Sequence, residues 1–597
     1  MSFGFNLYRS EKLRFKSLKN GALSRCGTGI YLTSLCLASP LAVAFDTDST
    51  LDTLPEVTVT STKIDVPAQY STQSVTILTE EQIKESNFSD TTEILRQLGG
   101  LQFMKAGGPG QFNAPEARGL PSAYFLVVVD GVKVNEGLSS GIGNFLGQID
   151  PKLIERIEIL RGPQGQLFGR NAMAGAVQIV TKRPSGEMSG DVSATVGSYG
   201  TRALKGRLDL PSFGGINVQV SGFFREHGGY VKAPSNTNLQ GIRIFNMRDE
   251  SSFNFKTTNY DRNLSQLKTY GGRLGVSYDS GPFSLYYSYD QSYARDDQGL
   301  TVFKDSCQFG SIYNPTNLCN QPATQFVVAP SGVTSFPQQA QGNKYNDSID
   351  YSIPWVPMIT KAHGHMLNLG YEASDDLTLR SISGYRYVNR YGGNTLSQAV
   401  NAVLPSATEY LRSRTYSEEL QAIYDTEQFD ITVGGIYFRE EIKDERASFF
   451  GVNCIGSPFI PACIDNGAIS GPGHAPFGDS FKRSWSTTNS YGLYAQGTWT
   501  PDVLDNRLSL IAGIRYSKET KKGLRSFDVG ICSTGAQALC TVPGTPGPVD
   551  IRNKYSTSRF DPAFTIKFDI NPDVNIYARW ARGFRSGGSS VRSPNFG

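Results

Sequence analysis

The chain has 597 residues, with 57 lysines and arginines against 54 aspartates and glutamates, so its formal net charge is only +3. A nearly neutral chain lacks the basic excess with which nucleic-acid-binding proteins attract phosphate, so we expect no nucleic-acid partner. Most of the long patterned segments alternate between apolar and polar residues, which predicts a mostly β protein.

The first 44 residues have the pattern of a secretory signal peptide. Basic residues come first, an apolar run from Gly29 to Leu41 follows, and Ala42-Val43-Ala44 supplies a small-x-small cleavage pattern. A membrane anchor is the alternative, but polar residues and a proline interrupt the run, which is shorter than the roughly 20 residues that span a bilayer. We therefore predict export, with residues 1–44 as signal peptide and 45–54 as linker.

Export changes how the cysteines are interpreted. Six cysteines follow the signal peptide, and they fall into three close pairs. Because an exported chain meets an oxidising compartment, this spacing predicts the local disulfides Cys307–Cys319, Cys454–Cys463 and Cys532–Cys540. The alternative is a set of metal sites, but the histidines do not join these pairs at ligand spacing, so no metal site is predicted.

A short strand is predicted directly after the linker, from Pro55 to Ser61. Val57 and Val59 alternate there with threonines. Polar segments flank the strand, so its main-chain groups could pair with the sheet edge of another protein. An ordinary first strand is the alternative.

A compact α/β region is expected over residues 62–185. Thr79 to Gln82 forms a helix capping box. A strongly apolar strand runs from Tyr124 to Val129 and ends at the Asp130-Gly131 turn. The segment from Ile154 to Pro184 places two further strands around a glycine-rich stretch, which lacks the spacing of the known phosphate-binding glycine motifs.

From residue 186 onward, strands of period two repeat. Phe283, Leu285, Tyr287 and Tyr289, for example, share one face of a strand. Tight turns alternate along the chain with long connections, among them residues 295–360, 445–483 and 524–552, and the three cysteine pairs lie in these long connections. A soluble β-sandwich also alternates, but this asymmetry is typical of a transmembrane β-barrel with short periplasmic turns and long outer loops. We count about 13 candidate strands in this part of the chain.

Together these features resemble a TonB-dependent outer-membrane receptor. Pro55–Ser61 resembles the TonB box, and the run ERIEILRGP at residues 155–163, followed by Gly169-Arg170-Asn171-Ala172, resembles the plug domain. The resemblance implies that residues 62–185, the plug region, sit inside an antiparallel transmembrane β-barrel formed by residues 186–597. It also implies a multi-pass protein of the bacterial outer membrane.

Barrels of this family have about 22 strands. Because we count only about 13 strands here, the resemblance implies that the barrel is incomplete and that the sequence is a fragment. We therefore expect that this chain by itself does not insert as a stable barrel, because an unpaired sheet edge in hydrocarbon is costly. Heat-modifiable gel migration of an outer-membrane preparation would contradict this expectation.

The function implied by the resemblance is active import of a scarce ligand, with a ferric siderophore or another iron complex first among the candidates. The ligand would carry Fe3+, and TonB with its proton-gradient-driven inner-membrane complex would supply the energy. Outer-membrane lipid surrounds such a barrel, and no covalently bound cofactor is implied. Alternatives are uptake of cobalamin, haem or a carbohydrate, or a passive porin or phage-receptor role. An enzyme is disfavoured, since no catalytic constellation stands out.

Three sets of site residues follow from the resemblance. Plug arginines of the family pair with barrel glutamates, so Arg118, Arg161 and Glu419 are candidates for a plug–barrel latch, with a surface charge pair as the alternative. Alternation places Glu419 on the lumen side of its strand. The TonB box comprises Pro55, Glu56, Val57, Thr58, Val59, Thr60 and Ser61. Candidate ligand contacts, which could equally be solvated loop residues, are Lys105, Gln111, Phe112, Asn113, Asn144 and Phe145.

Overall fold

The computed structural model describes residues 58–59, 66–67, 74–86, 88, 91–97, 101–105, 113–117, 119–120, 124–134, 149–229, 231–233, 243–246, 251–254, 262–264, 266–296, 357–395, 406–450, 478–528, 549–571 and 574–587. All of them belong to one compact unit, Glu56–Gly597. The predicted signal peptide, the linker and the three predicted disulfides lie outside the described residues. Within the described ranges, no helix has both the length and the apolar character needed to cross a bilayer.

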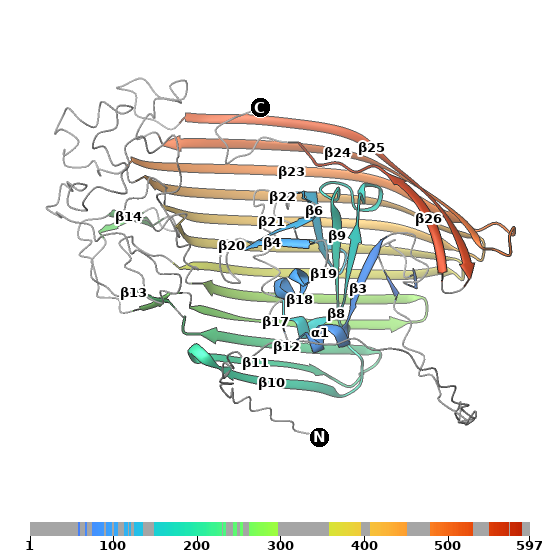
Figure 1. Cartoon of the computed structure of the whole chain (residues 1–597), viewed down its shortest axis with the longest axis horizontal. Coiled ribbons are helices and arrows are strands. Elements are labelled where there is room, and N and C mark those ends of the chain that lie inside the picture. Colours follow the sequence, from blue (N-terminus) through green and yellow to red (C-terminus); the bar gives the residue numbers. More distant parts are fainter. Residues whose placement is uncertain are drawn as a thin grey trace, which may run out of the picture. The chain divides into compact units, whose positions relative to one another are not determined.

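The plug region is built on a five-stranded sheet with the order β3-β8-β9-β6-β7 (Figure 1). Strands β6 and β9 run parallel, and the other neighbours are antiparallel. The elements up to the end of this region are β1 (Thr58–Val59), β2 (Val66–Pro67), β3 (Val75–Thr79), α1 (Glu80–Glu85), α2 (Thr91–Arg96), β4 (Leu101–Lys105), β5 (Asn113–Ala117), β6 (Phe125–Val129), β7 (Val132–Lys133), the 3-10 turn η3 (Pro151–Leu153), β8 (Ile154–Arg161), α4 (Gly165–Phe168) and β9 (Gly175–Thr181).

Two local predictions for the plug region are confirmed. The capping box begins α1, since Gln82 N donates to Thr79 Oγ1 at 3.4 Å and Thr79 N donates to Gln82 Oε1 at 3.1 Å. The predicted turn joins β6 to β7, with positive φ angles of 47° at Asp130 and 87° at Gly131. Such a pair of left-handed residues matches the twist of the two strands that it connects.

Burial of both faces of β6 explains why the sequence of this strand is apolar at every position. Val127 lies on one face of the plug sheet, in a core that also contains Leu95 of α2. Leu126 and Val128 lie on the other face, in a cluster that includes Tyr494 of the large sheet. Because both faces are buried, every position of the strand is apolar, and each fully buried side chain contributes about 1.5–3 kcal/mol.

The second part of the chain forms a 13-stranded antiparallel sheet, which confirms the predicted strand count. The sheet order is β10-β11-β12-β17-β18-β19-β20-β21-β22-β23-β24-β25-β26. These strands are β10 (Ser189–Gly197), β11 (Thr201–Asp209), β12 (Ile216–His227), β17 (Leu267–Ser280), β18 (Phe283–Asp296), β19 (Met358–Ser374), β20 (Leu377–Thr395), β21 (Ser406–Asp425), β22 (Phe429–Phe450), β23 (Gly478–Trp499), β24 (Leu508–Asp528), β25 (Val549–Asn571) and β26 (Val574–Ala581). The short elements between them are η4 (Ser198–Gly200), β13 (Val231–Ala233), β14 (Arg243–Asn246), β15 (Ser251–Asn254) and β16 (Arg262–Leu264).

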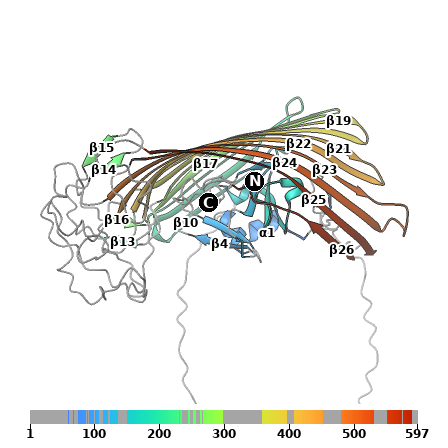
Figure 2. The same cartoon turned by 90° about the horizontal axis from the view of Figure 1, so that it is seen from above.

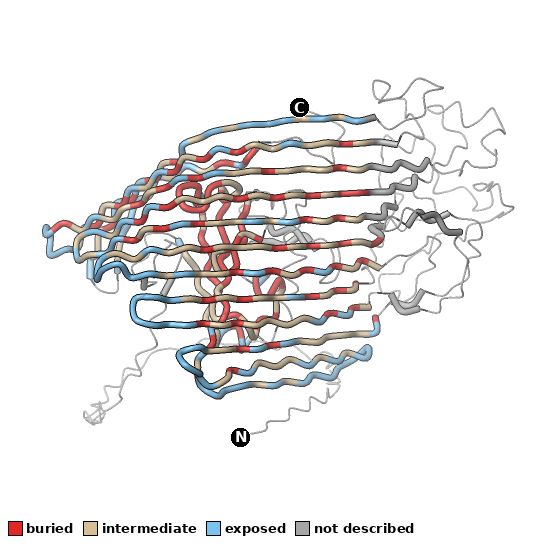
Figure 3. The backbone as a smooth tube through the Cα atoms, turned by 180° about the vertical axis from the view of Figure 1, so that it is seen from behind, coloured by how far each residue is buried: buried red, intermediate tan, exposed pale blue. Residues whose placement is uncertain are grey.

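The sheet curves around the plug region, which lies on its concave side (Figure 2). We call the side that touches the plug region the inner face and the opposite side the outward face. Figure 3 shows that buried residues gather in the plug region and along the middle strands, whereas β10 is largely exposed and β11 is mostly of intermediate exposure. In the described sheet, β10 and β26 are the two edge strands.

Alternation separates the two faces as the sequence predicts. On β24, Arg515 is 3% exposed whereas its neighbour Ile514 is 49% exposed. On β21, Glu419 is 3% exposed and Leu420 is 59% exposed. The predicted inward orientation of Glu419 is therefore confirmed.

Several strands extend further into the long connections than the sequence pattern indicates. The pattern placed a connection at residues 445–483, but β22 continues to Phe450 and β23 begins at Gly478. The sequence from residue 445 to 450 has no clear apolar alternation, but the backbone ladder continues there to the pair of Phe450 with Gly478. Lys443 still pairs with Trp485 in the sheet register.

Candidate functional site at the plug and sheet interface

The predicted TonB box is described only at Thr58 and Val59, which form β1. These residues pair with Pro67 and Val66 of β2 in a two-residue antiparallel ladder. Two residue pairs make few hydrogen bonds, so little free energy opposes the separation of β1 from β2. The other five box residues lie outside the described residues.

The three latch candidates have different outcomes. Arg161, at the end of β8, donates from Nη1 to Thr76 Oγ1 of β3 at 2.5 Å. Glu419 accepts hydrogen bonds on Oε1 from Tyr494 at 2.6 Å and from Gln421 at 2.9 Å, all within the large sheet. Arg118 lies outside the described residues. The latch role of Arg161 and Glu419 stays a prediction.

The candidate ligand contacts can be placed only in part. Lys105 ends β4 and Asn113 begins β5, and the two residues pair with each other in the β4–β5 hairpin. Gln111, Phe112, Asn144 and Phe145 lie outside the described residues. The ligand-binding role of all six stays a prediction.

An arginine of the plug region reaches two acidic side chains of the large sheet. Arg170, between α4 and β9, lies 3.3 Å from Glu519 Oε2 of β24 and 3.9 Å from Glu440 Oε2 of β22. Its guanidinium also lies over the ring of Phe438, 4.7 Å from the centroid. Both carboxylates are 2% exposed at the side chain and Arg170 is 10% exposed, so solvent screens the pair weakly. This ionic contact between the plug region and the sheet is therefore largely buried.

A second inner-face cluster holds helix α4. Arg515 donates from Nη1 to the backbone oxygen of Leu167 at 3.3 Å and from Nε to Ser517 Oγ at 2.9 Å. Its guanidinium also lies 5.7 Å from the ring centroid of Tyr494, whose hydroxyl donates to Glu419. Glu419 therefore belongs to the network that positions Arg515 against the plug region.

A third contact anchors the β6–β7 turn. Asp130 accepts hydrogen bonds from Thr181 N at 2.8 Å and from Thr181 Oγ1 at 2.7 Å, so its carboxylate is held by the plug region. Arg273 of β17 donates to Asp130 Oδ2 at 2.8 Å and to the hydroxyl of Tyr286 at 3.1 Å. Next to this contact Val132 packs on Ile382 and two further residues of the sheet.

Lysine–carboxylate pairs join the plug region to β10 and β11, the first two strands of the large sheet. Lys152 Nζ lies 3.1 Å from Asp191 Oδ2 of β10, and Lys205 Nζ of β11 lies 3.0 Å from Asp150 Oδ1. The two pairs have opposite polarity, so each side supplies one cation and one anion. Charge complementarity of this kind fixes the register of two surfaces more than it adds affinity.

One carboxylate of the plug region has a shifted pKa. Burial by itself raises the pKa of Glu80, but the hydrogen bonds and charges of Lys182 and Lys84 outweigh it and hold the pKa below its ordinary value of 4.5. The ammonium groups lie 2.7 Å and 2.5 Å from Glu80 Oε1. Because Lys182 follows β9 directly, this pair ties α1 to the plug sheet.

The sequence pointed to some of these residues without giving them a role. Arg170 is part of the plug-like motif, and Arg515 falls on the polar face of an alternating strand. Their partners could not be chosen from the sequence, because the alternation shows which face a residue occupies but not what approaches that face. Among the described residues, no group of three or more histidines, cysteines and carboxylates could hold a metal ion.

Two family models match the chain. Residues 67–176 match the TonB-dependent receptor plug domain, and residues 314–597 match the TonB-dependent receptor-like β-barrel. The vitamin B12 transporter BtuB of Vibrio vulnificus (strain CMCP6) is 25% identical over 296 residues, which are 49% of this chain and 46% of that protein. The chain thus spans about half the length of the curated relative that it matches.

Solved structures share the fold. The ferric yersiniabactin uptake receptor FyuA from Yersinia pestis superposes with a TM-score of 0.62 at 16% identity, over 88% of this chain and 67% of that one. The open form of the ferric-catecholate import receptor Fiu from E. coli K12 superposes with a TM-score of 0.59 at 15% identity, over 87% of this chain and 71% of that one. A plug inside a curved antiparallel sheet, the two family models and these similarities agree, and the chain belongs to the TonB-dependent receptors of the bacterial outer membrane.

Proposed function

We propose that the chain acts in the energy-dependent import of a ferric siderophore, or a similar iron complex, across the outer membrane. The observation that carries the proposal is the ionic and hydrogen-bonded seating of the plug on the inner face, with Arg170 between Glu440 and Glu519 at its centre. A plug that is held partly by buried charged contacts can be displaced and can return.

The physical argument concerns desolvation. A buried ion pair gains Coulomb energy but loses the hydration of both ions, so its net stabilisation is small. When the plug moves and water enters, Arg170 and the two glutamates regain hydration, which offsets much of the lost attraction. An apolar interface of the same area would lose its burial free energy with no such compensation.

The energy would enter at β1. Thr58 and Val59 have only a two-residue ladder with β2, so a strand of TonB can take the place of β2 or add to the free edge. Force applied there would pass through the residues that precede β3 into the plug sheet. The inner-membrane proton gradient would drive this step through TonB and its complex.

Iron complexes are supported as the substrate by the proteins that share the fold. FyuA, Fiu and the Pseudomonas aeruginosa receptor bound to ferripyoverdine are named for ferric chelates. A corrinoid is the second candidate, because the curated relative is a vitamin B12 transporter. Both substrates would use the same plug and the same energy source.

Uptake of radiolabelled iron by cells that express the chain tests the proposal. Val57→Pro removes a main-chain donor next to β1, so it should abolish energised uptake while leaving surface binding of the ferric siderophore unchanged. Val57→Ile keeps the donor and serves as the matched control. Loss of binding in Val57→Pro, or uptake equal to that of Val57→Ile, would contradict the mechanism. Uptake of labelled cobalamin and not of iron would favour the second candidate.

A further inference from the structure

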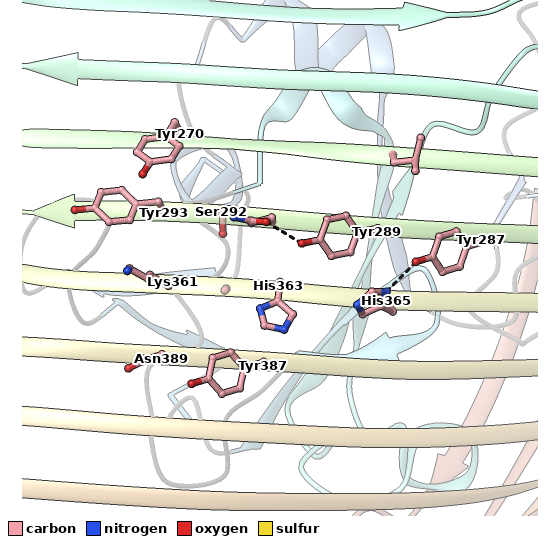
Figure 4. Close-up of a pocket in the computed structure, with 13 residues that line it drawn as sticks. Tyr270, Tyr287, Tyr289, Ser292, Tyr293, Lys361, His363, His365, Tyr387 and Asn389 are labelled. Atoms are coloured by element: carbon pink, nitrogen blue, oxygen red, sulfur yellow. Dashed lines mark hydrogen bonds between the residues drawn. The ribbon is translucent and has the colours of Figure 1, made fainter. Parts of the chain in front are cut away.

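The last edge of the large sheet differs from its middle strands in what it touches. Over β17 to β20, aromatic rings surround a hollow of about 790 Å3, and all the residues that line it belong to those four strands (Figure 4). At the edge strand β26, by contrast, the chain leaves the sheet after Ala581 and crosses to the plug region. Residues 582–587 make this crossing, and we call them the strap.

The strap is packed against the plug region. Asn171 N donates to Phe584 O of the strap at 3.1 Å, and the Phe584 side chain is buried. Arg585 donates from Nη1 to the hydroxyl of Tyr124 at 3.4 Å, and its guanidinium lies 5.1 Å from the centroid of that ring. At Gly165 of α4 the two backbones approach so closely that an added Cβ would lie 2.6 Å from a backbone oxygen of the strap. The strap therefore covers α4.

The strap also contacts the large sheet. Ser586 donates a hydrogen bond to Glu519 of β24, the residue that pairs with Arg170. Arg582 N donates to Pro562 O of β25 at 3.1 Å. The strap therefore ties the plug region to two strands, β24 and β25.

Strand β25 offers the strap a second position. It spans Val549–Asn571, but its ladder with β26 ends at the pair of Ala563 with Ala581. Within the described ranges, no strand pairs with the rest of β25 on this side. If the ladder continued in the same register, Phe584 would lie opposite Phe560, which faces outward and is 57% exposed. Such an aromatic pair stabilises neighbouring antiparallel strands.

Asp561 of β25 favours the same second position. Its side chain is fully buried, and neither carboxylate oxygen accepts a hydrogen bond from the described residues, although Arg559 Nε lies 3.4 Å away. A buried carboxylate without hydrogen bonds is costly. In the continued ladder Arg585 would lie opposite Arg559 and diagonal to Asp561, within reach of its carboxylate. Lifting of the strap would thus give Asp561 a charge-assisted hydrogen bond.

We propose that the strap is a gate on the plug with two positions. In the closed position, which the structure has, the strap covers α4. In the open position it continues β26 along β25, and Arg515 of β24 alone holds α4 by its hydrogen bond to Leu167 O. Plug contacts and ladder contacts replace each other, so neither position leaves the strap without partners. The inference rests on the plug movement of the proposed function and names what regulates it.

Hydrogen exchange of the full-length chain in detergent tests the gate. Gly165→Ala places a methyl group against the strap, so exchange at Asn171 N should accelerate by about tenfold or more. The amides of Phe560 and Ser558 point to the same side of β25 as Pro562 O, because backbone groups alternate along a strand. Their exchange should slow by about tenfold as the strap enters the ladder. Simple unfolding of the plug would not protect them.

The matched control is Gly206→Ala on β11. Its added methyl group would lie 3.6 Å from its nearest neighbours, an ordinary contact, so exchange at all three amides should stay within about twofold of the natural chain. The proposal is overturned if Gly165→Ala behaves as this control does. It is also overturned if Asn171 N exchanges faster while Phe560 and Ser558 gain no protection, because the strap then has no second position on β25.

A cross-link tests the closed position without a steric clash. A Cβ added at Gly583 would lie 3.2 Å from Pro163 Cβ, close to the roughly 3.5–4.5 Å found in disulfides. In the double variant Pro163→Cys and Gly583→Cys, exchange at Asn171 N should be about tenfold slower in the oxidised form than in the reduced form. The natural chain under the same reductant is the control. Equal exchange in both forms would contradict the gate, and neither measurement depends on uptake, so a failure of the proposed function remains distinguishable.

Discussion

Substitution of Arg170 by glutamine tests how the plug is held. Arg170→Gln removes the cation that lies 3.3 Å from Glu519 and 3.9 Å from Glu440, together with its contact to the Phe438 ring. Two carboxylates that are 2% exposed then lose their shared arginine. Lys521, 3.4 Å from Glu519, continues to compensate one of them.

The size of the destabilisation expected for Arg170→Gln follows from the burial of the ion pair. Removal of one partner from a buried ion pair destabilises a protein by about 3–5 kcal/mol. Arg170 is 10% exposed and Glu519 keeps a second cation, which places the expected loss near the lower end, about 3 kcal/mol. At 1.4 kcal/mol for each factor of ten, local opening becomes roughly a hundredfold more frequent.

Hydrogen exchange of the segment from α4 to β9 measures this opening. Its amides include Asn171 N, which donates to Phe584 O beyond β26 at 3.1 Å and so reports on plug seating. We expect exchange there to accelerate roughly a hundredfold in Arg170→Gln, whereas exchange in β19 stays unchanged.

The control is Arg96→Gln, which removes an exposed plug arginine whose side chain is 46% accessible. Loss of such a surface charge should change stability by less than about 1 kcal/mol. If the amides from α4 to β9 exchange in Arg170→Gln at a rate within about twofold of that in the natural chain, Arg170 does not hold the plug as inferred. A double variant with Glu440→Gln should recover part of the loss, because it removes the second of the two carboxylates that lost the arginine, while Lys521 still compensates Glu519.

Three further predictions concern single contacts. Tyr494→Phe removes the hydroxyl that donates to Glu419 at 2.6 Å, so the free energy of unfolding should fall by about 1.5–3 kcal/mol in denaturant titrations, and an unchanged midpoint would contradict this. Gly175→Ala forces a side chain onto a residue with φ of +148° and against the backbone of the adjacent strand, so we expect a loss of more than about 2 kcal/mol and a lower melting temperature. Because the pKa of Glu80 is lowered in the folded plug, the Glu80–Lys182 pair should stabilise the plug above the ordinary carboxyl pKa of 4.5, and this stabilisation should disappear as the pH falls through the lowered pKa. Glu80→Gln should flatten that dependence in melting curves taken as a function of pH, and an unaltered slope would exclude Glu80 as its source.

Much of the fold could be predicted because its signals are local. The alternation that placed Glu419 inward and Leu420 outward depends only on the two-residue repeat of a strand. The capping box at Thr79 and the turn at Asp130 likewise depend on side chains within a few residues. The strand ends inside the predicted connection 445–483 were missed, since the backbone ladder continues to the pair of Phe450 with Gly478 without a clear apolar alternation in the sequence.

The candidate site could be predicted only in part. The plug motif contains Arg161 and Arg170 nine residues apart, and the sequence offered no physical reason to prefer one of them as the contact to the sheet. In the structure Arg161 donates to Thr76 of the plug region, and Arg170 reaches Glu440 and Glu519 of the large sheet, while the latch role of Arg161 stays a prediction. The acidic partners of Arg170 come from β22 and β24, far away in the chain, so the motif alone could not identify them.

The sequence by itself determined the strand count, the plug region and the face on which each strand residue lies, because these depend on repeats and turn signals between near neighbours. Only the tertiary structure decided that Arg170, Glu440 and Glu519 meet. These residues lie tens to hundreds of positions apart in the chain. Sheet register and curvature bring them together, and both depend on how many strands and turns pack together rather than on the near neighbours of any one residue.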